Sequence, residues 1–497
     1  MAEMRPGSFD SNDPPFRESS QQSLQSLTSL MFRDSSQQSL STPQSRRAGR
    51  DNRRLSEGAS FSSQGEKLTE VMRSVRKLKT MPLPEESRHD DVHISPEAQA
   101  MLHKLHEDHQ KKHQGLRCEL DMSNEALNSC WMRGQSWHVH TQLPPGDSEV
   151  EFNTRSLRVF PARDSKGNAF LAEAGIAAVN TKGRKGSWDK SLGQDACSVS
   201  HLSQGWEVLC LMDGHGSGGH WPALRAARTL PYVLQNSEGC VTMLRHGKVD
   251  AALHHAFDKV QQNLVYESIA GDIDLHACGC TALCVLRHAS RDSLWVATAG
   301  DSRAALLVPG RGVVAQTVDH KPSLELERLR LERMGCEIVR TEHEDGFVEE
   351  RVNIAGEDFP GLCMSRSLGD LALKDFGVIS DPEVVEWPLG SLLKDQAYVL
   401  AASDGVWEFM STDSVADLVL AALARGDSLR QASQELLKMA RAAWVAKEED
   451  YCDDITVILA PVTRPPHRGG RGTVCAGRWC CAQGPSTLVE RSGCSTM

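Results

Sequence analysis

The chain has 497 residues, a length that corresponds to about three domains at most. It carries 55 Lys and Arg against 66 Asp and Glu, a formal net charge of −11, so nucleic acid is not expected as its main ligand. No run of about 18 or more apolar residues occurs, so no transmembrane segment is expected. The amino-terminal residues lack the apolar stretch of a secretory signal, and the 15 cysteines follow no disulfide-framework spacing, which favours free thiols in a reducing compartment.

Residues 1–85 are predicted to form a disordered tail. The first 50 residues contain twelve Ser and six Gln and few large apolar residues, so they cannot bury enough surface to offset their chain entropy. The segment FRESSQQSL at Phe16–Leu24 recurs as FRDSSQQSL at Phe32–Leu40, which fits either a short docking or phosphorylation motif or a simple duplication. The RRLS sequence at Arg53–Ser56 is typical of sites for basic-directed kinases.

Residues 86–154 are predicted to be a helical or irregular lead-in, with a charged amphipathic helix from about Ser95 to Gln114. Ser95 and the proline that follows it provide a cap and a first-turn residue for this helix. Four histidines at spacings of three and four share one broad face, which favours a solvated polar face over the alternative of a metal site. They are His103, His106, His109 and His113.

Residues 466–497 are predicted to be a flexible tail rich in Arg and Cys. The chain ends with Cys494, Ser, Thr and Met, which has the form of a prenylation signal, although its two middle residues are polar rather than aliphatic. Lipidation there, with an acyl chain on Cys480 or Cys481, would give a weak membrane association. A plain disordered tail is the favoured interpretation.

Residues 155–465 contain the globular part of the chain. Apolar runs of strand length alternate with turn clusters and helical stretches, and the predicted strands include 207–212, 293–299, 397–403 and 455–462. Predicted helices cover Pro322–Gly335, with Pro near the start and Gly after the end, and Ser411–Gly426, with cap candidates at its start. Two packed sheets with flanking helices would accommodate a unit of this size.

Acidic residues stand where three of the predicted strands end or begin. Asp213-Gly214 and Asp404-Gly405 each follow a strand, and Asp453 opens another. Carboxylates and backbone carbonyls are ligands that Mg²⁺ and Mn²⁺ prefer, and two such ions about 4 Å apart would bridge one water and suit phosphoester hydrolysis. A single Asp-Gly pair is also typical of a turn, so the pattern alone leaves both interpretations open.

Nine segments of this region occur in the order typical of one enzyme family. They are KGRKG…GQDA (Lys182–Ala196), LMDGHGSGGH (Leu211–His220), GCTALCVL (Gly279–Leu286), ATAGDSRAAL (Ala297–Leu306), DHKPSLELERLRLERMGCEIV (Asp319–Val339), GLCMSRSLGD (Gly361–Asp370), GVISDPEV (Gly377–Val384), AASDGVWEFMS (Ala401–Ser411) and DDITVILA (Asp453–Ala460). Together they resemble the metal-dependent type 2C Ser/Thr protein phosphatase family. The resemblance implies an α+β fold in which two packed antiparallel β-sheets are flanked by helices, a four-layer αββα sandwich.

The resemblance also implies a site for two Mg²⁺ or Mn²⁺ ions and a weaker third. Its residues are Asp213 as the bridging ligand, the carbonyl of Gly214 on one ion, Asp404 and Asp453 on the other, Asp195 acting through waters, and Asp301 beside the third ion. His215 is similar to the family's candidate general acid for the leaving Ser or Thr oxygen, and its alternative role is a structural hydrogen bond. Arg303 and Arg366 are expected to support the fold by pairing with Asp301 and Asp370.

One segment departs from the family pattern. A basic residue that holds the substrate phosphate is expected a few positions before GQDA, but here SWDKSL separates KGRKG from that motif. Arg184, Lys185 and Lys190 are therefore all candidates. Motif similarity favours Lys185 with Arg184, proximity to GQDA favours Lys190, and we select Lys185. A lysine would act as a point charge, whereas a guanidinium would bind phosphate through two hydrogen bonds.

The leading functional hypothesis is a protein-serine/threonine phosphatase. A water bridging two Mg²⁺ or Mn²⁺ ions would attack phosphorus directly, and phosphorylated proteins would be the substrates. The alternatives are a catalytically weak fold that binds phosphoproteins as a scaffold, and a phosphatase of small phosphate esters. We expect a monomer in the cytoplasm, with the nucleus, or a membrane if the C-terminal Cys is lipidated, as the other locations.

Overall fold

The computed structural model describes residues 118–462, apart from short internal gaps, and five earlier positions. The gaps are at 133, 163–165, 187–188, 272, 343–347, 391 and 393–395. The five earlier positions are all helical, as the helix predicted over 95–114 requires, and are Ala100, Lys104, Glu107, Asp108 and Lys111. The repeat in the amino-terminal tail, the RRLS sequence, the four histidines of the predicted helix and the C-terminal cysteines lie outside the described residues. No helix among the described residues is long and apolar enough to cross a membrane.

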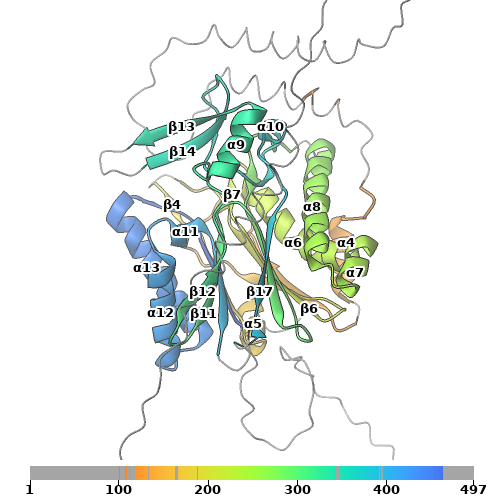
Figure 1. Ribbon diagram of the computed structural model, residues 1–497, viewed down its shortest axis with the longest axis vertical. Coiled ribbons are helices and arrows are strands. Elements are labelled where there is room, and N and C mark those ends of the chain that lie inside the picture. Colours follow the sequence, from red (N-terminus) through yellow and green to blue (C-terminus); the bar gives the residue numbers. More distant parts are fainter. Residues whose placement is uncertain are drawn as a thin grey trace, which may run out of the picture. The chain divides into compact units, whose positions relative to one another are not determined.

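Two antiparallel sheets packed face to face form the centre of the fold (Figure 1). The seven-stranded sheet has the order β17 (Glu383–Pro388), β10 (Ser293–Ala299), β9 (Ala282–His288), β6 (Trp206–Met212), β5 (Ala196–His201), β1 (Trp137–Thr141) and β2 (Leu157–Phe160). The five-stranded sheet has the order β12 (Gly312–Gln316), β11 (Arg303–Val308), β18 (Tyr398–Ala402), β20 (Ile455–Pro461) and β3 (Ala177–Thr181). The four strands predicted from apolar runs are β6, β10, β18 and β20.

Smaller sheets and the helices complete the architecture. The small sheets are β13 (Cys336–Glu342) with β14 (Val348–Ile354) and β15 (Pro360–Leu362), β16 (Leu368–Gly369) with β8 (Gly279–Cys280) and β7 (Gly214–His215), and β19 (Tyr451–Cys452) with β4 (Arg184–Lys185). The helices are α4 (Asn124–Ser129), the 3₁₀ turn η1 (Cys130–Met132), α5 (Gly167–Glu173), α6 (His220–Asn236), α7 (Glu238–Arg245), α8 (Val249–Gly271), α9 (Glu325–Met334), α10 (Leu371–Lys374), α11 (Asp404–Trp407), α12 (Thr412–Ala424) and α13 (Leu429–Glu448).

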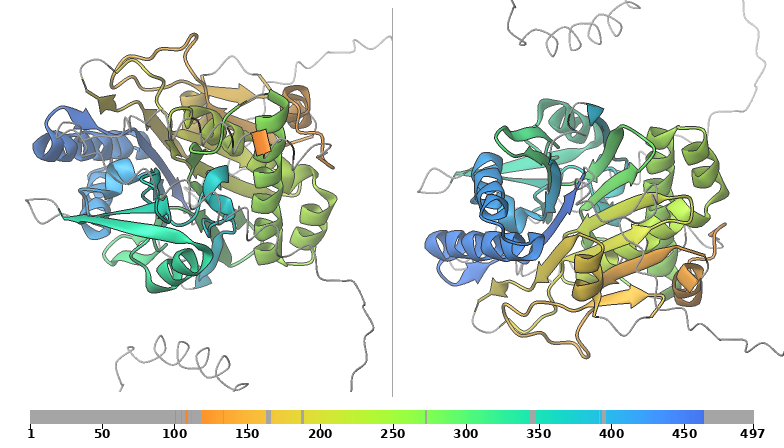
Figure 2. Two further views of the ribbon diagram at one scale, coloured as in Figure 1. Left: turned by 90° about the horizontal axis from the view of Figure 1, so that it is seen from above. Right: turned by 90° about the horizontal axis from the view of Figure 1, so that it is seen from below.

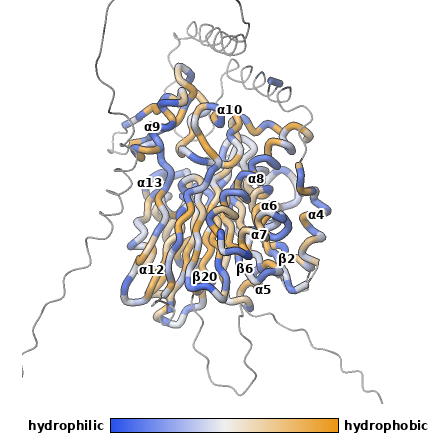
Figure 3. Tube along the Cα trace, turned by 45° about the vertical axis from the view of Figure 1, so that its right-hand side comes forward, coloured by the Kyte–Doolittle hydropathy of each residue, from blue (hydrophilic) through white to orange (hydrophobic). Residues whose placement is uncertain are grey.

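Helices cover the outer face of each sheet (Figure 2). Helices α6, α7 and α8 pack on the seven-stranded sheet, and α12 and α13 pack on the five-stranded sheet. Within β6, Leu209 packs in the layer between the sheets with Val399, while Cys210 packs against the helices. This strand is buried on both faces, and its sequence is accordingly apolar apart from Glu207. Figure 3 colours the chain by the hydropathy of each residue. The predicted four-layer αββα sandwich is confirmed.

The predicted helices end within two residues of α9 and α12, but α9 begins at Glu325, three residues after the predicted start at Pro322, and the domain starts earlier than predicted. The side chain of Ser411 caps α12 by accepting a hydrogen bond from the Ser414 N–H at 3.2 Å, and α9 ends at Gly335 with φ of 100°. Residues before the predicted boundary at 155 belong to the same core, because β1 pairs with β5 inside the seven-stranded sheet. Helix α4 is joined to α6 by a hydrogen bond from Arg228 to Asn124 at 3.0 Å.

A small lobe lies beyond one end of the two sheets (Figure 1). It consists of α9, α10 and the sheet β13–β14–β15, and its own core includes Leu331, Val352 and Leu373. Between β15 and α10 the chain passes through β16, which pairs with β8, and β8 in turn pairs with β7. The lobe is therefore connected to the end of the sandwich where β6 runs into β7.

Candidate active site

The acidic residues expected to hold metal lie at strand ends in both sheets. In the seven-stranded sheet, Asp195 precedes β5 and Asp213 follows β6, and these two strands are antiparallel neighbours. In the five-stranded sheet, Asp404 follows β18 and Asp453 precedes β20, which are also antiparallel neighbours. Because the end of one antiparallel strand lies beside the start of its partner, each sheet brings two carboxylates to one edge.

The carboxylates from the two sheets are close enough to repel one another. Burial raises the pKa of Asp213 well above its usual range, and Asp404, Asp195 and Asp453 raise it further. Burial also raises the pKa of Asp404 to about 7, with Asp301 as the next cause. The pKa of Asp195 is likewise raised to about 7 by burial and by neighbouring acids. Buried acids that raise one another's pKa values mark a candidate functional site.

The oxygen atoms of this acidic cluster fit a hard divalent cation. Oδ1 of Asp301 and Oδ1 of Asp404 are buried and accept no hydrogen bond from any described residue. A bound cation would satisfy these oxygens and offset the repulsion, and carboxylates are ligands that Mg²⁺ and Mn²⁺ prefer. Within the described part of the chain, no group of three His, Cys, Asp or Glu side chains already has the arrangement of a complete metal site. The fit therefore rests on the donor chemistry and on these two oxygens.

The backbone around Asp213 is tightly held. The Asp213 N–H donates to Oγ1 of Thr281 at 3.0 Å, and the Thr281 N–H donates to the Asp213 carbonyl oxygen at 2.8 Å. The next residue, Gly214, has no room for a side chain, because a Cβ atom would lie 2.3 Å from the carbonyl oxygen of Gly219 and 2.7 Å from that of Gln194. Glycine is thus required where three backbone segments approach one another beside the acidic cluster.

His215 makes a hydrogen bond whose partner, Asp370, the sequence did not indicate. Its side chain is 21% exposed, and its Nε2 lies 2.8 Å from Oδ2 of Asp370. Its Nδ1 is buried and has no hydrogen-bond partner among the described residues. One ring nitrogen is therefore engaged by a buried carboxylate and the other is not engaged by the protein.

The two arginines expected to pair with acids of the site pair elsewhere. Arg303 forms an ion pair with Asp319 at 2.6 Å, so the expectation that it pairs with Asp301 is wrong. Arg366 forms an ion pair with Glu327 at 2.7 Å, so its expected partner is also wrong. Both side chains hold elements together, which agrees with their expected supporting role.

The three candidates for phosphate binding lie in different surroundings. Lys185 donates from Nζ to Oε1 of Gln194, in the GQDA motif, at 3.3 Å. Arg184 donates from Nη2 to Asp450 at 2.8 Å, and Lys190 is exposed. Successive residues of a strand point to opposite sides, so Arg184 and Lys185 of β4 cannot both face the acidic cluster. The contact with Gln194 favours Lys185.

Comparison with known proteins decides the family. The family model for protein phosphatase 2C matches residues 179–448, more than half of the chain. The chain belongs to the protein phosphatase 2C family. Probable protein phosphatase 2C 48 of Oryza sativa subsp. japonica is 33% identical over 59% of this chain and 86% of the relative. Probable protein phosphatase 2C 61 of Arabidopsis thaliana is 33% identical over 55% of this chain and 82% of the relative.

Solved structures of the same family are also similar. The crystal structure of serine-threonine phosphatase 2C from Toxoplasma gondii has a TM-score of 0.48 and 17% identity, and the match covers 65% of this chain and 98% of that one. As a member of the protein phosphatase 2C family, the chain is a protein-serine/threonine phosphatase.

Sequence reasoning missed two charged residues at the acidic cluster. Lys321 Nζ lies 2.5 Å from Oδ2 of Asp301. Burial lowers the pKa of Lys321, but Asp301 and Asp404 outweigh burial and raise it, so its ammonium stays charged. Asp454 accepts hydrogen bonds from the backbone N–H of Gly183 at 2.6 Å and of Asp195 at 3.3 Å. Lys321 belongs to the DHKP motif and Asp454 to the DDIT motif. The positions of these motifs in the sequence do not indicate that Lys321 pairs with Asp301 or that Asp454 binds the backbone at Gly183 and Asp195.

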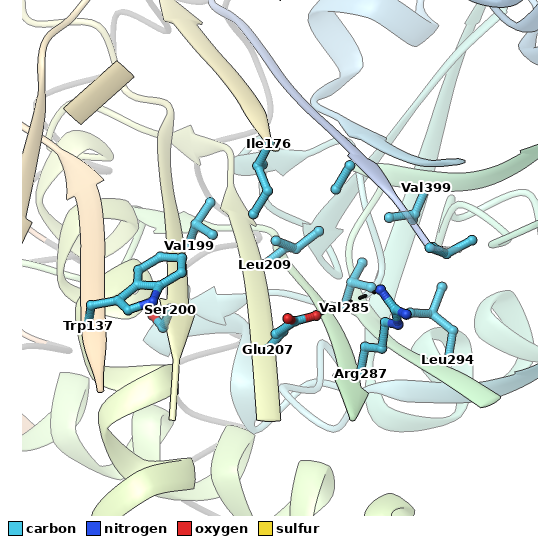
Figure 4. Close-up of a pocket in the computed structure, with 12 residues that line it drawn as sticks. Trp137, Ile176, Val199, Ser200, Glu207, Leu209, Val285, Arg287, Leu294 and Val399 are labelled. Carbon is cyan, nitrogen blue, oxygen red and sulfur yellow. Dashed lines mark ion pairs between the residues drawn. The ribbon is translucent and has the colours of Figure 1, made fainter. Parts of the chain in front are cut away.

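A cavity lies between the two sheets at the opposite end of β6 from the acidic cluster (Figure 4). Apolar core residues dominate its lining, and Glu207 and Arg287 stand directly opposite each other on β6 and β9. Their charged atoms are 3.8 Å apart, and burial raises the pKa of Glu207 to about 8. This cavity belongs to the packing between the sheets of the phosphatase and is separate from the acidic cluster.

Proposed function

We propose that this phosphatase hydrolyses phosphoserine and phosphothreonine in proteins with two bound Mg²⁺ or Mn²⁺ ions. The observation that carries the proposal is the convergence of buried carboxylates from both sheets, with unpartnered oxygens on Asp301 and Asp404. When bound, the ions would supply a water of lowered pKa as the nucleophile and offset the negative charge of the phosphate. The residues that would hold them are Asp213, Asp404, Asp453 and the carbonyl of Gly214, with Asp195 acting through waters and Asp301 beside a weaker third ion.

Side chains around the acidic cluster would handle the substrate. Lys185 would hold the phosphate as a point charge, because its ammonium lies beside the GQDA motif while that of Lys190 is exposed and Arg184 is paired with Asp450. His215 would donate a proton to the leaving Ser or Thr oxygen, a step that general acids assist by about 100-fold or more. The scaffold hypothesis gains no support from the similarity to protein phosphatases.

The proposal is tested with the purified full-length chain and a phosphothreonine peptide. We expect turnover with Mn²⁺ and nearly none in excess chelator, and calorimetry should detect Mn²⁺ uptake. Asp453→Asn should weaken Mn²⁺ uptake and turnover together, because it removes one expected ligand. Asp381→Asn is the matched control, since the Asp381 carboxylate pairs with the half-buried His254 at 2.6 Å and lies outside the acidic cluster. Full activity in chelator, or unchanged Mn²⁺ uptake by Asp453→Asn, would refute the proposal.

The class of substrate needs a separate comparison. The same preparation is assayed on a phosphoprotein and on a small phosphate ester at equal concentrations. We expect a higher kcat/KM for the phosphoprotein, because binding away from the reacting phosphate also contributes to transition-state stabilisation. Equal values for the two substrates would favour the phosphatase of small esters.

A further inference from the structure

The small sheet β16–β8–β7 brings two distant parts of the chain together beside the acidic cluster. In this sheet His215 is paired with Gly279, and Gly279 is paired with Gly369 on its other side. The residue after Gly369 is Asp370, so His215 stands on one outer strand of the sheet and Asp370 directly follows the other. Their side chains meet across the middle strand, where Nε2 and Oδ2 are 2.8 Å apart.

Glycine in the middle strand leaves the space for this contact. A Cβ atom at Gly279 would lie 2.2 Å from Oδ2 of Asp370, which is far inside contact distance. Any side chain there would displace the carboxylate from the histidine. The contact between His215 and Asp370 is therefore built into the backbone and does not depend on a flexible surface pairing.

Several further interactions fix the carboxylate of Asp370. Its backbone is in the left-handed region, with φ of 45°, and its N–H donates to the Cys278 carbonyl at 2.9 Å. The Ser367 hydroxyl donates to Oδ2, and Lys374 Nζ donates to the Ser367 carbonyl at 2.8 Å. Burial would raise the pKa of Asp370, but His215 and Lys374 outweigh it and the pKa is lowered. A buried, ionised and immobile carboxylate is suited to orient an imidazole ring.

We infer that Asp370 is the positioning residue for His215: it accepts the hydrogen of Nε2, fixes the ring, and leaves Nδ1 as the nitrogen that exchanges a proton with the substrate. This inference rests on the proposed role of His215 as the general acid. Nδ1 is the ring nitrogen that has no partner among the described residues. Asp370 itself touches neither the phosphate nor the leaving oxygen in this scheme.

The experiment compares two substrates whose leaving groups differ in their need for a proton. Phenyl phosphate has a poor leaving group, and p-nitrophenyl phosphate has a good one. For Asp370→Asn in the full-length chain with Mn²⁺, we expect kcat on phenyl phosphate to fall at least about 10-fold, because general-acid assistance is worth about 100-fold or more. The kcat on p-nitrophenyl phosphate should change less than threefold, and KM should stay similar. Asn adopts left-handed backbone readily, so the substitution keeps the local conformation.

A double-mutant cycle separates positioning from general damage. His215→Gln alone should show the same loss on phenyl phosphate, and Asp370→Asn added to it should cause little further loss, because both changes remove one function. Asp381→Asn, which alters a histidine–aspartate pair at the surface, is the control and should leave both substrates unaffected. Equal losses on both substrates, or additive losses in the double variant, would overturn the inference.

A spectroscopic measurement tests the inference without using activity. In long-range ¹H–¹⁵N spectra of histidine-labelled protein, the His215 signal is assigned by its absence in His215→Gln. We expect wild-type His215 to carry its proton on Nε2 and Asp370→Asn to change that signal. A wild-type His215 with a bare Nε2 would overturn the inference even if the enzyme is active. Wild-type protein that lacks activity but shows the expected signal would instead count against the proposed function.

Discussion

Replacement of Asp404 by Asn should stabilise the metal-free fold while it removes nearly all turnover. Burial and the neighbouring Asp301 raise the pKa of Asp404 from 3.8 to about 7. Each unit of this pKa difference corresponds to about 1.4 kcal/mol. Keeping Asp404 ionised in the folded state therefore lowers the free energy of unfolding by at most about 4 kcal/mol above pH 7. The amide side chain introduced by Asp404→Asn has the shape of the carboxylate without its charge. Its buried polar atoms without hydrogen-bond partners lower the free energy of unfolding by about 1–3 kcal/mol. The expected net gain in the free energy of unfolding is about 1–3 kcal/mol.

Urea unfolding in excess chelator at pH 7.5 and at pH 5 measures this gain. A group with a raised pKa contributes most stability below its unfolded pKa and loses it as pH rises, so the advantage of Asp404→Asn should be larger at pH 7.5. Mn²⁺ should reverse the order, because a ligand at about 100 times its Kd stabilises wild type by about 2.7 kcal/mol and the variant by less. Asp417→Asn, on the exposed face of α12, is the control. A variant less stable than wild type in chelator at pH 7.5 would refute the reasoning.

Three further predictions follow from the same structure. Because burial raises the pKa of Glu207 to about 8, this residue should contribute to a fall in wild-type stability between pH 4.5 and 8. Glu207→Gln should make that fall shallower in urea unfolding, and the part that remains comes from the raised pKa values of Asp195 and Asp404; parallel pH profiles for wild type and variant would contradict this. Lys185→Met should raise KM for a phosphopeptide by about 10-fold, the worth of one charge-assisted hydrogen bond, whereas Arg184→Met should change it less than threefold in the same assay. Gly214→Ala should lower the free energy of unfolding by about 1–3 kcal/mol, because its Cβ would overlap the Gly219 carbonyl; an unchanged urea midpoint would contradict the required glycine.

Local patterns in the sequence were sufficient for much of the fold. Strand β6 and helix α12 are where apolar runs and cap residues predict them, because burial on both faces and a Ser411 cap leave direct traces in the sequence. Strand β1 was assigned to an irregular lead-in for the opposite reason. Its sequence WHVHT contains two histidines that are buried against Trp131 and Phe160, so a buried strand looks polar in the sequence.

Partners that meet through tertiary structure could not be predicted. The acids at the ends of β6, β18 and β20 were expected to converge because of the family resemblance, whereas their spacing alone left both a turn and a metal site open. The pairing of His215 with Asp370 depends on Gly279 in a strand of two residues, which no periodicity marks. The ammonium of Lys321 beside Asp301 likewise follows from how the loops cross rather than from their sequences.

The hydrogen bond between the Gly183 N–H and Asp454 joins residues 271 positions apart. The same carboxylate also holds the Asp195 N–H, and the strand after it, β20, pairs with β3 at the edge of the five-stranded sheet. Such long loops close slowly, because their entropy is lost before the contacts form. Because Asp454 lies near the end of the domain, the ribosome must release almost the entire domain before these contacts can form, and we expect a nascent chain without β20 to have no phosphatase activity.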